Sequence, residues 1–251
     1  MTGLSPPGPS VPTLSLPGRI QADELMDIEE VTDADLARCL RDLERVNRAS
    51  LGYRPTLRWL DRAARGRTHL TILDVGFGGG DMLRQVARWA RRRRKTVTLI
   101  GLDINPAAAR VAAAATDTGL GIAFETADLF DWPADRPVDI ILNALFAHHL
   151  ADADLPRFLH WMEERARVGW FVNDLHRHWI PEWGLRILFA ILPVHRFVRH
   201  DGPVSVRRAF SAADLRAVVA AAGLEPGAVT LRWWFPFRWG LGRLKPAPPR
   251  P

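Results

Sequence analysis

The sequence predicts an α/β protein with a doubly wound, mostly parallel sheet, on three observations. Residues 71–75 are β-branched and apolar, and a glycine-rich turn and a helical pattern from Met82 to Ala90 follow directly. Strand and helix patterns then alternate as far as Asn173, which favours parallel strands joined by right-handed crossovers. Residues 138–143 form an apolar run that is typical of a parallel strand buried on both faces.

The composition suits one domain with additions. A chain of 251 residues can bury a sizeable core, and its one cysteine, Cys39, excludes an internal disulfide framework. The net charge of +6 permits binding to nucleic acid or to an anionic membrane without arguing strongly for either. We expect a cytoplasmic protein, because the N-terminus lacks a signal-peptide pattern and the longest apolar run, residues 187–192, is far below the roughly 20 residues of a membrane-spanning helix.

Ahead of the first strand we expect a disordered, proline-rich segment over residues 1–20 and a helical cap over residues 21–66. Periodic apolar residues predict helices within the cap at 23–29, 32–48 and 55–64. Thr32 and Asp35 have the spacing of a capping box at the start of the second helix. Because the cap precedes the glycine-rich turn, it could cover a ligand rather than build the sheet.

Beyond the first strand the alternating pattern predicts strands at residues 96–103, 121–125, 138–143 and 168–173, with helices at 107–115 and 155–167. The pattern then changes to an apolar helical region at 180–198, broken at Pro193, and a basic loop at 199–208. We interpret residues 179–210 as a lid. Ser211 and Asp214 cap a further helix that ends at Gly223, two closing strands follow at 229–234 and 237–241, and residues 245–251 form a flexible tail.

The glycine-rich turn differs from the fingerprint of a dinucleotide dehydrogenase, which has the form G-x-G-x-x-G. Asp81 stands where that fingerprint needs its third glycine, and the pattern reads G-x-G-x-G over residues 76–80, preceded by Asp74. An acid at this turn would repel a pyrophosphate and suits a cationic ligand that carries an amino group and a sulfonium. The alternative is an ordinary strand-to-helix turn.

Two aspartates follow the next two strands. Asp103 ends the strand at 96–103, where its two carboxylate oxygens can accept hydrogen bonds from both hydroxyls of a ribose; the alternative is a helix cap before Pro106. Asp128 follows the strand at 121–125, where it can accept from the exocyclic amine of adenine; the alternative is a loop cap.

In order along the chain, residues 73–81, 101–106, 127–129 and 138–150 resemble the class I S-adenosylmethionine-dependent methyltransferases. The resemblance extends over about residues 70–174. It implies the Rossmann-like methyltransferase fold, a seven-stranded sheet whose last strand is antiparallel, within a domain at residues 67–244. It also implies S-adenosylmethionine as the cofactor, held by Asp74, Gly76, Phe77, Gly78, Gly80, Asp103, Ile104, Asp128, Leu129 and Asn143.

The flanking segments at 43–48, 173–178 and 200–208 resemble a bacterial small-molecule branch of these enzymes, whose members are often linked to polyketide, phenolic or quinone metabolism. Methyl transfer depends on positioning, and a base helps when the acceptor must lose a proton. The main hypothesis is therefore methylation of a small aromatic or polyketide-derived acceptor, most simply at oxygen.

Candidate catalytic residues follow the fourth and fifth strands, at the edge where open α/β sheets bind ligands. They are His149, our first choice as the base, His148 and Asp174. For the histidines the alternative is a hydrogen bond that supports the loop, and Asp174 could only orient a neighbouring side chain. Candidate acceptor-binding residues are His178, Arg177, Arg207 and Trp183. We expect no metal site.

The lid has three interpretations. Its large apolar residues, Trp179, Trp183, Phe189 and Ile191, could wall an acceptor pocket, pack in the core, or rest on a membrane surface. The basic run at 91–95 ends a helix, where cations are favoured, and its alternative role is RNA binding.

Two other functions remain open: a protein that binds S-adenosylmethionine without catalysis, and an RNA or protein methyltransferase. Against the latter, Asn143-Ala-Leu-Phe stands where enzymes that methylate the amino group of a base carry Asn/Asp-Pro-Pro followed by an aromatic residue. We therefore expect no nucleic-acid partner, and the sequence leaves the oligomeric state open.

Overall fold

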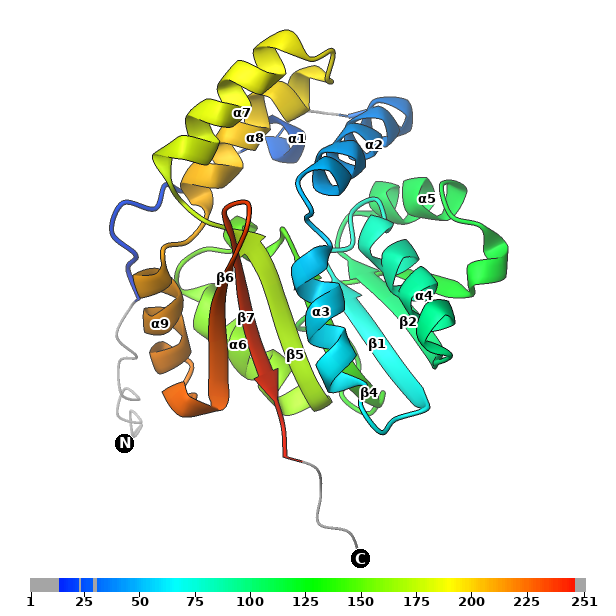
Figure 1. Cartoon of the computed structure of the whole chain (residues 1–251). Helices are drawn as coiled ribbons and strands as arrows, with labels where there is room; N and C mark the ends of the chain where they lie inside the picture. The colour runs from blue at the N-terminus through cyan, green and yellow to red at the C-terminus, as the bar shows by residue number, and fades with distance from the viewer. Residues whose placement is uncertain (1–13, 23, 29–30, 247–251) are drawn as a thin grey trace, which may run out of the picture.

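Seven strands form one sheet in the order β3-β2-β1-β4-β5-β7-β6 (Figure 1). The computed structural model describes residues 14–22, 24–28 and 31–246. The strands are β1 His69–Val75, β2 Thr96–Asp103, β3 Ile122–Thr126, β4 Val138–Ala144, β5 Ala166–Leu175, β6 Val229–Trp234 and β7 Arg238–Leu244. The first five strands pair in parallel and β7 runs antiparallel between β5 and β6. The predicted fold class is therefore confirmed, including the antiparallel last strand.

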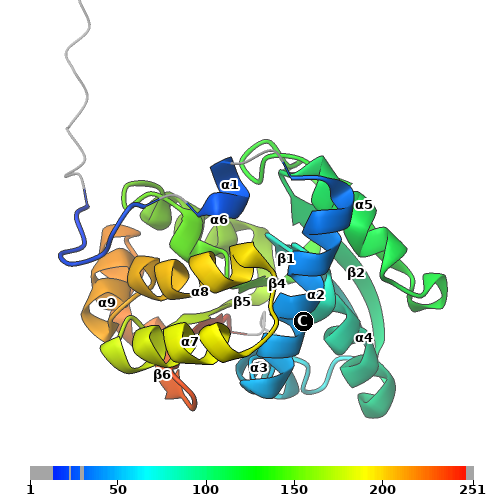
Figure 2. The ribbon, with the colours of Figure 1, turned by 90° about the horizontal axis from the view of Figure 1, so that it is seen from above.

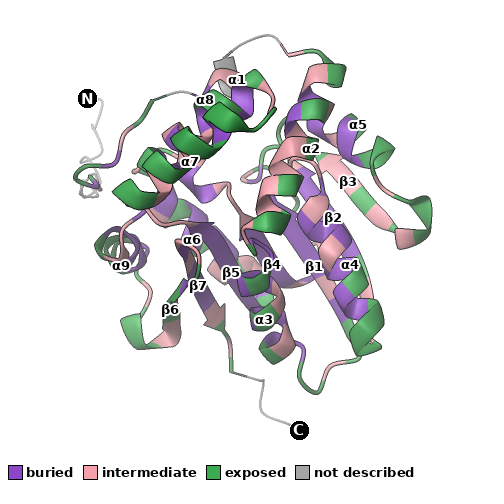
Figure 3. Ribbon diagram, turned by 45° about the horizontal axis from the view of Figure 1, so that its top comes forward, coloured by how far each residue is buried: buried purple, intermediate pink, exposed green. Residues whose placement is uncertain are grey.

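Helices cover both faces of the sheet. The helices of the described residues are α1 Leu25–Ile28, α2 Asp33–Ala49, α3 Arg54–Ala63, α4 Asp81–Arg93, α5 Pro106–Ala114, α6 Asp154–Arg165, α7 Trp179–Ile191, α8 Arg196–Arg208 and α9 Ala212–Ala221. One core cluster joins α3 and α4 to the sheet around Leu60 and Leu83, and a second joins α6 and α9 around Phe158 and Trp170. The central strands, β4 and β5 among them, are buried between these layers (Figure 3). This burial on both faces is why β4 has an apolar rather than an alternating sequence.

Four helices gather over the carboxyl-terminal ends of β1, β4 and β5. Figures 1 and 2 show α1, α2, α7 and α8 above this edge. Cys39 of α2 packs there with Phe189 of α7 and Phe197 of α8 in a small core of its own. Thr32 caps α2 as predicted, since its Oγ1 accepts from the backbone N–H of Asp35 at 3.1 Å. Helices α1 and α2 of the cap and helices α7 and α8 of the lid thus lie over this edge of the sheet, whereas α3, which also belongs to the predicted cap, packs on its face.

The basic loop predicted at residues 199–208 is wrong, because these residues belong to helix α8. Pro203 lies inside the helix and is itself buried. Phe197, Val198 and Val206 bury one face of α8, and burial of an apolar face outweighs the unfavourable helix propensity of one proline. The break predicted at Pro193 is present, since it separates α7 from α8.

The disordered N-terminal segment predicted at residues 1–20 is too long. Residues 1–13 lie outside the described part of the chain, but residues 14–20 are packed, and Leu16 is only 3% exposed. Arg19 is buried, and its guanidinium donates to the carbonyl oxygens of His148, Leu150 and Arg208. The proline-rich composition of this segment contained no indication that Leu16 and Arg19 anchor it.

At the other end, the predicted flexible tail lies outside the described residues from 247 onward, whereas the backbone N–H of Lys245 still donates to Val168. Within the described ranges, no helix has the length and apolar character needed to cross a membrane.

Candidate active site

The turn between β1 and α4 brings backbone rather than side chains to the edge of the sheet. Gly76, Gly78 and Gly80 have φ values of 69°, 50° and 70°, in the left-handed region that glycine adopts without strain. A Cβ on Gly76 would lie 2.4 Å from the ring of Phe146, so only glycine fits this position. Helix α4 begins at Asp81 without a side-chain cap, so its first N–H groups face the turn.

Asp103 lies beside this turn, as predicted for a residue that binds a ribose. Its Oδ2 accepts from the N–H of Gly78 at 3.0 Å, and its Oδ1 accepts from the N–H of Asn105 at 3.0 Å. Burial raises the pKa of Asp103, while these hydrogen bonds act in the opposite direction. The alternative role as a helix cap falls to Asn105 instead, whose Oδ1 accepts from the N–H of Ala107 at 2.9 Å. Each oxygen of Asp103 keeps a further lone pair for a hydroxyl.

Asp74 is 1% exposed, and its Oδ1 has no hydrogen-bond partner in the described part of the chain. Burial, together with the charges of Asp81 and Asp103, raises its pKa well above the usual value. A buried carboxylate without a partner is costly, and a neighbouring cation would relieve that cost. The site therefore fits a ligand that carries a positive charge, which was the reason for proposing Asp74 from the sequence.

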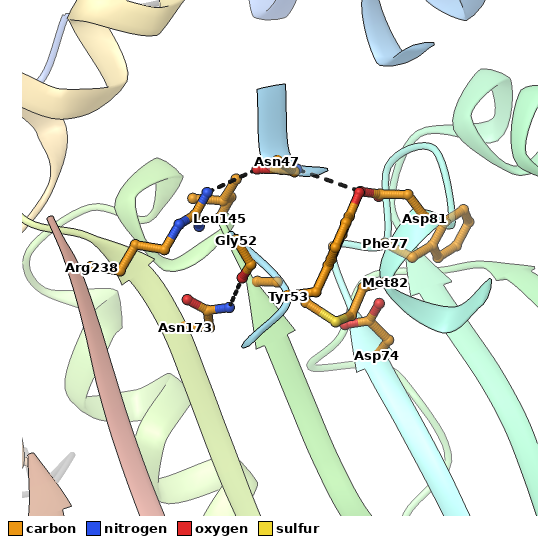
Figure 4. A pocket seen from close by; sticks show the side chains of 12 residues that line it. Asn47, Gly52, Tyr53, Asp74, Phe77, Asp81, Met82, Leu145, Asn173 and Arg238 are labelled. Carbon is orange, nitrogen blue, oxygen red and sulfur yellow. Dashed lines mark hydrogen bonds between the residues drawn. The ribbon is translucent and has the colours of Figure 1, made fainter. Parts of the chain in front are cut away.

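Asp74 lines a cavity whose opposite side carries a residue that sequence reasoning missed. Figure 4 shows Arg238, from the start of β7, across this cavity from Asp74. Arg238 is 4% exposed, and its Nη2 donates to Asn47 Oδ1 at 2.9 Å. Burial lowers the pKa of Arg238 to about 10, while Asp174, Tyr53 and Asp81 raise it, so the guanidinium is charged near neutral pH.

Three further residues from the helical cap and α4 complete this cavity. The hydroxyl of Tyr53 donates to Asp81 Oδ2 at 2.6 Å, and Asn47 Nδ2 donates to the same oxygen at 3.4 Å (Figure 4). Asn47 thus contacts both the cation of Arg238 and the anion of Asp81. A cavity with a buried cation on one side and the carboxylates of Asp74 and Asp81 on the other matches an amino-acid group, which carries one carboxylate and one ammonium.

The other residues predicted to hold the cofactor near the ends of β2 and β3 differ in exposure. Ile104 is 68% exposed beside Asp103, whereas Leu129 is buried in the core. Asp128 is exposed, and its Oδ1 accepts from the N–H of Phe130 at 2.8 Å, which is the loop-cap alternative. Phe77 is buried against Phe124, with ring centroids 5.0 Å apart, and it also lines the cavity of Asp74.

Two buried asparagines stand at the ends of the neighbouring strands. Asn143 of β4 donates from Nδ2 to the carbonyl of Val75 at 3.1 Å, which ties β4 to β1 just ahead of the glycine turn. Asn173 of β5 donates to the carbonyl of Gly52 at 2.8 Å. In both residues Oδ1 is buried without a partner among the described residues. Unpartnered acceptors of this kind are expected where a ligand with N–H or O–H donors binds.

The predicted catalytic residues His148 and Asp174 form a buried pair. His148 Nδ1 lies 2.7 Å from Asp174 Oδ1, and the backbone N–H of His148 donates to Asp174 Oδ2 at 3.2 Å. Burial alone would raise the pKa of Asp174, but the charge of His148 and its hydrogen bond lower it overall. Asp174 thus stays ionised and orients His148, which is one of the roles predicted for it.

Glu24, which the sequence did not single out, approaches both histidines. One carboxylate oxygen lies 3.8 Å from His148 Nε2 and the other lies 4.0 Å from His149 Nε2. Ser205 of α8 donates to Glu24 Oε1 at 2.7 Å and fixes the carboxylate. Glu24 comes from the N-terminal segment, so neither spacing nor a local motif could connect it to these histidines. Its only sequence signal is an acid directly before the apolar pair Leu25 and Met26.

The same three side chains could also hold a cation. The ligand atoms of Glu24, His148 and His149 all lie within 4.8 Å of one another. Two imidazoles and a carboxylate are suitable ligands for a transition metal. The absence of a metal site therefore stays a prediction.

The predicted acceptor-binding residues do not converge. Arg177 donates to Asp214 Oδ2 at 2.8 Å and to the carbonyl of Pro17, so it anchors the N-terminal segment to α9. His178 caps α7 by accepting from the N–H of Ile180. Trp183 is 55% exposed on α7, and Arg207 is exposed on α8.

The aromatic wall predicted for an acceptor pocket is likewise not formed. Phe189 packs with Cys39 in the core, and Trp179, Trp183 and Ile191 are exposed on α7.

The sheet order and the glycine turn define a nucleotide-binding α/β protein. Residues 72–169 match the protein family described as "Methyltransferase domain". These residues therefore carry a methyltransferase domain, and the glycine turn, the unpartnered Asp74 and Asp103 fit S-adenosylmethionine as its cofactor. No curated protein gives a significant match to the chain.

Solved methyltransferases share the fold. A methyltransferase from Aquifex aeolicus is 16% identical with a TM-score of 0.57, and the match covers 86% of this chain and 99% of that one. The plantazolicin methyltransferase BpumL, solved with S-adenosylhomocysteine, is 10% identical with a TM-score of 0.60, covering 85% and 95%. Magnesium protoporphyrin IX methyltransferase (ChlM) from Synechocystis PCC 6803 is 15% identical with a TM-score of 0.55, covering 87% and 90%. At these identities the likeness concerns the fold alone.

Proposed function

We propose that the protein methylates an oxygen of a small aromatic or polyketide-derived acceptor. The observation that carries this proposal is the cluster of Glu24, His148, His149 and Asp174 at the ends of β4 and β5, beside the glycine turn. An acceptor hydroxyl must lose a proton as it is methylated, and histidine is suited to accept one near neutral pH. The flanking segments that resemble a bacterial small-molecule branch support the same class of acceptor.

For the cofactor we propose that the two buried charges of the cavity hold the amino-acid tail. Asp74 would face the ammonium group and Arg238 the carboxylate. Asp103 would accept from the ribose hydroxyls, Asp128 from the adenine amine, and Ile104 and Leu129 would pack against the adenine ring. Gly76, Gly78 and Gly80 would let the backbone approach, and the free Oδ1 of Asn143 would accept from the tail.

We assign the base to His149, which is more exposed than His148. Glu24 would stabilise the imidazolium that forms when His149 takes the proton. His148, held by Asp174, would keep Glu24 in place from its other side. The domain division proposed from the sequence stays part of this proposal: a cap at 21–66, a catalytic domain at 67–244 and a lid at about 179–210.

The proposed step balances without a further reactant. Bound S-adenosylmethionine supplies an electrophilic methyl group on a sulfonium. The acceptor oxygen gives its proton to His149 and its electron pair to the methyl carbon. The bond from that carbon to sulfur breaks, and S-adenosylhomocysteine leaves as a neutral thioether.

Labelled S-adenosylmethionine with a panel of phenols, quinols and alkylresorcinols tests the activity. We expect labelled methyl ethers, and we expect His149→Gln to lower kcat by about 10²–10⁴-fold with little change in cofactor affinity. His160→Gln is the matched control, because His160 lies on the far helix α6 and pairs only with Glu164 among the described residues. If the histidine cluster transfers a proton, treatment with EDTA should leave the rate unchanged. If EDTA abolishes activity and a divalent metal restores it, the cluster is a metal site instead.

Two outcomes would contradict the proposal. Tight cofactor binding with no product from any small-molecule extract would favour a non-catalytic binder. Label that appears only in RNA or protein would favour the macromolecular alternative.

A further inference from the structure

The largest group of exposed apolar side chains in the described part of the chain lies on α7. Seven large residues are each more than two fifths exposed: Trp179, Ile180, Trp183, Ile187, Leu188, Ile191 and Leu192. We call this set the α7 face. Ile187 is 61% exposed and Ile191 77%, whereas Phe189 alone on α7 is buried. Monomeric soluble proteins rarely leave so long an apolar stripe in water, so this face indicates a partner.

The α7 face points away from the site. Figure 2 shows α8 between α7 and α1, so that α7 forms the outer edge of the lid, and Figure 3 shows its outer side exposed. Phe189 and the partly buried Leu185 fill the inner side of α7. An acceptor bound over β4 and β5 would therefore not cover the α7 face.

Aromatic rings extend the face onto the turn between β6 and β7. His178 stacks on Trp179, with centroids 5.8 Å apart, and contacts Phe237 at 5.3 Å. Phe237 in turn contacts Trp233 at 6.1 Å, and Phe235 at the tip of the turn is 66% exposed. Exposed tryptophans at the border of an apolar face are typical of side chains that sit among lipid headgroups.

The charges of the lid favour an anionic partner. Arg199 and Arg207 of α8 are exposed, and their guanidinium groups form no hydrogen bond or ion pair within the described ranges. The two carboxylates of the lid are not available to them, because Glu182 is half-buried and paired with Arg186 at 2.8 Å, and Asp201 is buried. The lid therefore combines an apolar stripe with two cations that have no counter-charge among the described residues.

These features distinguish a bilayer from a second copy of the chain. A symmetric dimer through α7 would bring each lid against its own copy, so Arg199 and Arg207 would meet arginines and no free carboxylate. An anionic lipid surface satisfies both features at once, because it takes apolar side chains below the headgroups and attracts arginines from above. We propose that the α7 face and the turn between β6 and β7 dock on the surface of an anionic lipid bilayer.

This proposal goes beyond the proposed methylation and does not depend on it. It gives a route for an acceptor, because the lid that covers the site would be the part of the enzyme next to the lipid. A lipophilic acceptor could then reach the site without crossing water. Vesicle binding needs neither acceptor nor turnover, so it can fail or succeed separately from the activity.

Flotation of the full chain with phosphatidylcholine vesicles, with and without phosphatidylglycerol, tests the proposal. We expect binding to the anionic vesicles that weakens as salt is added. Ile187→Glu with Ile191→Glu should weaken it by about tenfold or more, because two charges would enter the apolar layer. Arg199→Gln with Arg207→Gln should weaken it by several-fold and flatten the salt dependence.

Leu244→Glu is the matched control, because Leu244 is also exposed but lies at the far end of β7. It should bind vesicles like the unaltered protein, and all three variants should keep their affinity for S-adenosylhomocysteine, which reports an intact fold. Two results would overturn the proposal: no binding of the unaltered protein to anionic vesicles, or a stable dimer in solution that the double glutamate variant dissociates.

Discussion

Replacing Arg238 by glutamine should remove the ability of the protein to distinguish ligands by their carboxylate. Arg238 is buried beside Asn47, and one Nη2 hydrogen bond leaves most of its donors unused in the described residues. A hydrogen bond between two charged groups contributes about 1.5–3 kcal/mol. The unaltered protein should therefore bind S-adenosylhomocysteine about 10- to 150-fold more tightly than the same thioether without its carboxylate.

Calorimetry measures the affinity of the unaltered protein and of Arg238→Gln for S-adenosylhomocysteine and for the thioether without its carboxylate. The ratio of the two affinities is then compared between the two proteins. In Arg238→Gln the preference for the carboxylate should fall below about threefold, whereas Arg238→Lys should keep an intermediate preference, because lysine retains the charge but not the forked donors. The comparison of two ligands cancels any general loosening of the site, which a single affinity would not do.

Arg243→Gln is the matched control, since Arg243 stands on the same strand but interacts with Glu163 away from the cavity. It should leave the preference unchanged. If Arg238→Gln kept the full preference while its thermal unfolding stayed cooperative, the carboxylate would bind elsewhere, and Arg238 would serve only to offset the charge of Asp81.

The remaining predictions concern buried groups. Burial raises the pKa of Asp74 in the free protein, and a bound ammonium would lower it. At a pH between these two pKa values the ligand must displace a proton from Asp74, so the affinity for S-adenosylhomocysteine should fall as the pH falls through this window. In Asp74→Asn, calorimetry should show an affinity that does not change with pH over the same window. Burial raises the pKa of Cys39 to about 12, so DTNB at pH 8 should leave the native thiol unreacted and label it only after denaturation; rapid labelling of native protein would mean that the core around α7 opens. Gly76→Ala should destabilise the protein in urea by more than Gly66→Ala, because both have positive φ but only Gly76 has an aromatic ring within 2.4 Å of the added Cβ; equal losses would show that the ring moves aside.

The features that the sequence predicted correctly are those in which cause and effect lie close together in the chain. The place of Asp103 at the end of β2 is confirmed, because the strand and the aspartate are adjacent in the chain, and its role toward a ribose stays a proposal. The capping of α9 by Ser211 and Asp214 is confirmed for the same reason, since both hydrogen bonds span three residues. Local spacing determines such contacts whatever the rest of the chain does.

The direction in which a side chain points was harder to predict than the helix or strand that carries it. The tryptophans of α7 are apolar and helical, so a pocket wall, a core and a membrane contact were equally consistent with the sequence. The elements that pack against each face of α7 decide which side chains are buried. They cover Phe189 and leave Trp183 exposed. Arg177 was similarly ambiguous, because an arginine after β5 can reach either a ligand or Asp214 of α9.

Arg238 and Glu24 were missed because each acts on residues far away in the sequence. Arg238 contacts Asn47 across 191 positions, and Glu24 reaches Ser205 across 181. A signal for Arg238 did exist: it is the one charged residue between Trp233 and Trp239, where the other side chains are aromatic or proline. A lone charge in such a stretch is costly to bury without a partner, so Arg238 indicates an anion or another polar partner nearby.

These two residues suggest how the site achieves its chemistry. The glycine turn and Asp103 belong to the continuous segment at residues 72–169 that matches the methyltransferase domain. Arg238 and Glu24 lie outside it, at opposite ends of the chain. Pairing of β7 with β5 places Arg238 beside the end of β5, and contacts with α8 and His148 place Glu24 near the same edge of the sheet. Arg19 links these parts, because it fixes the N-terminal segment to the carbonyls of His148 and Leu150. Packing of the N-terminal segment therefore sets the position of Glu24 and of the histidine turn together, so a variant that frees this segment should impair proton transfer while the adenosyl contacts remain.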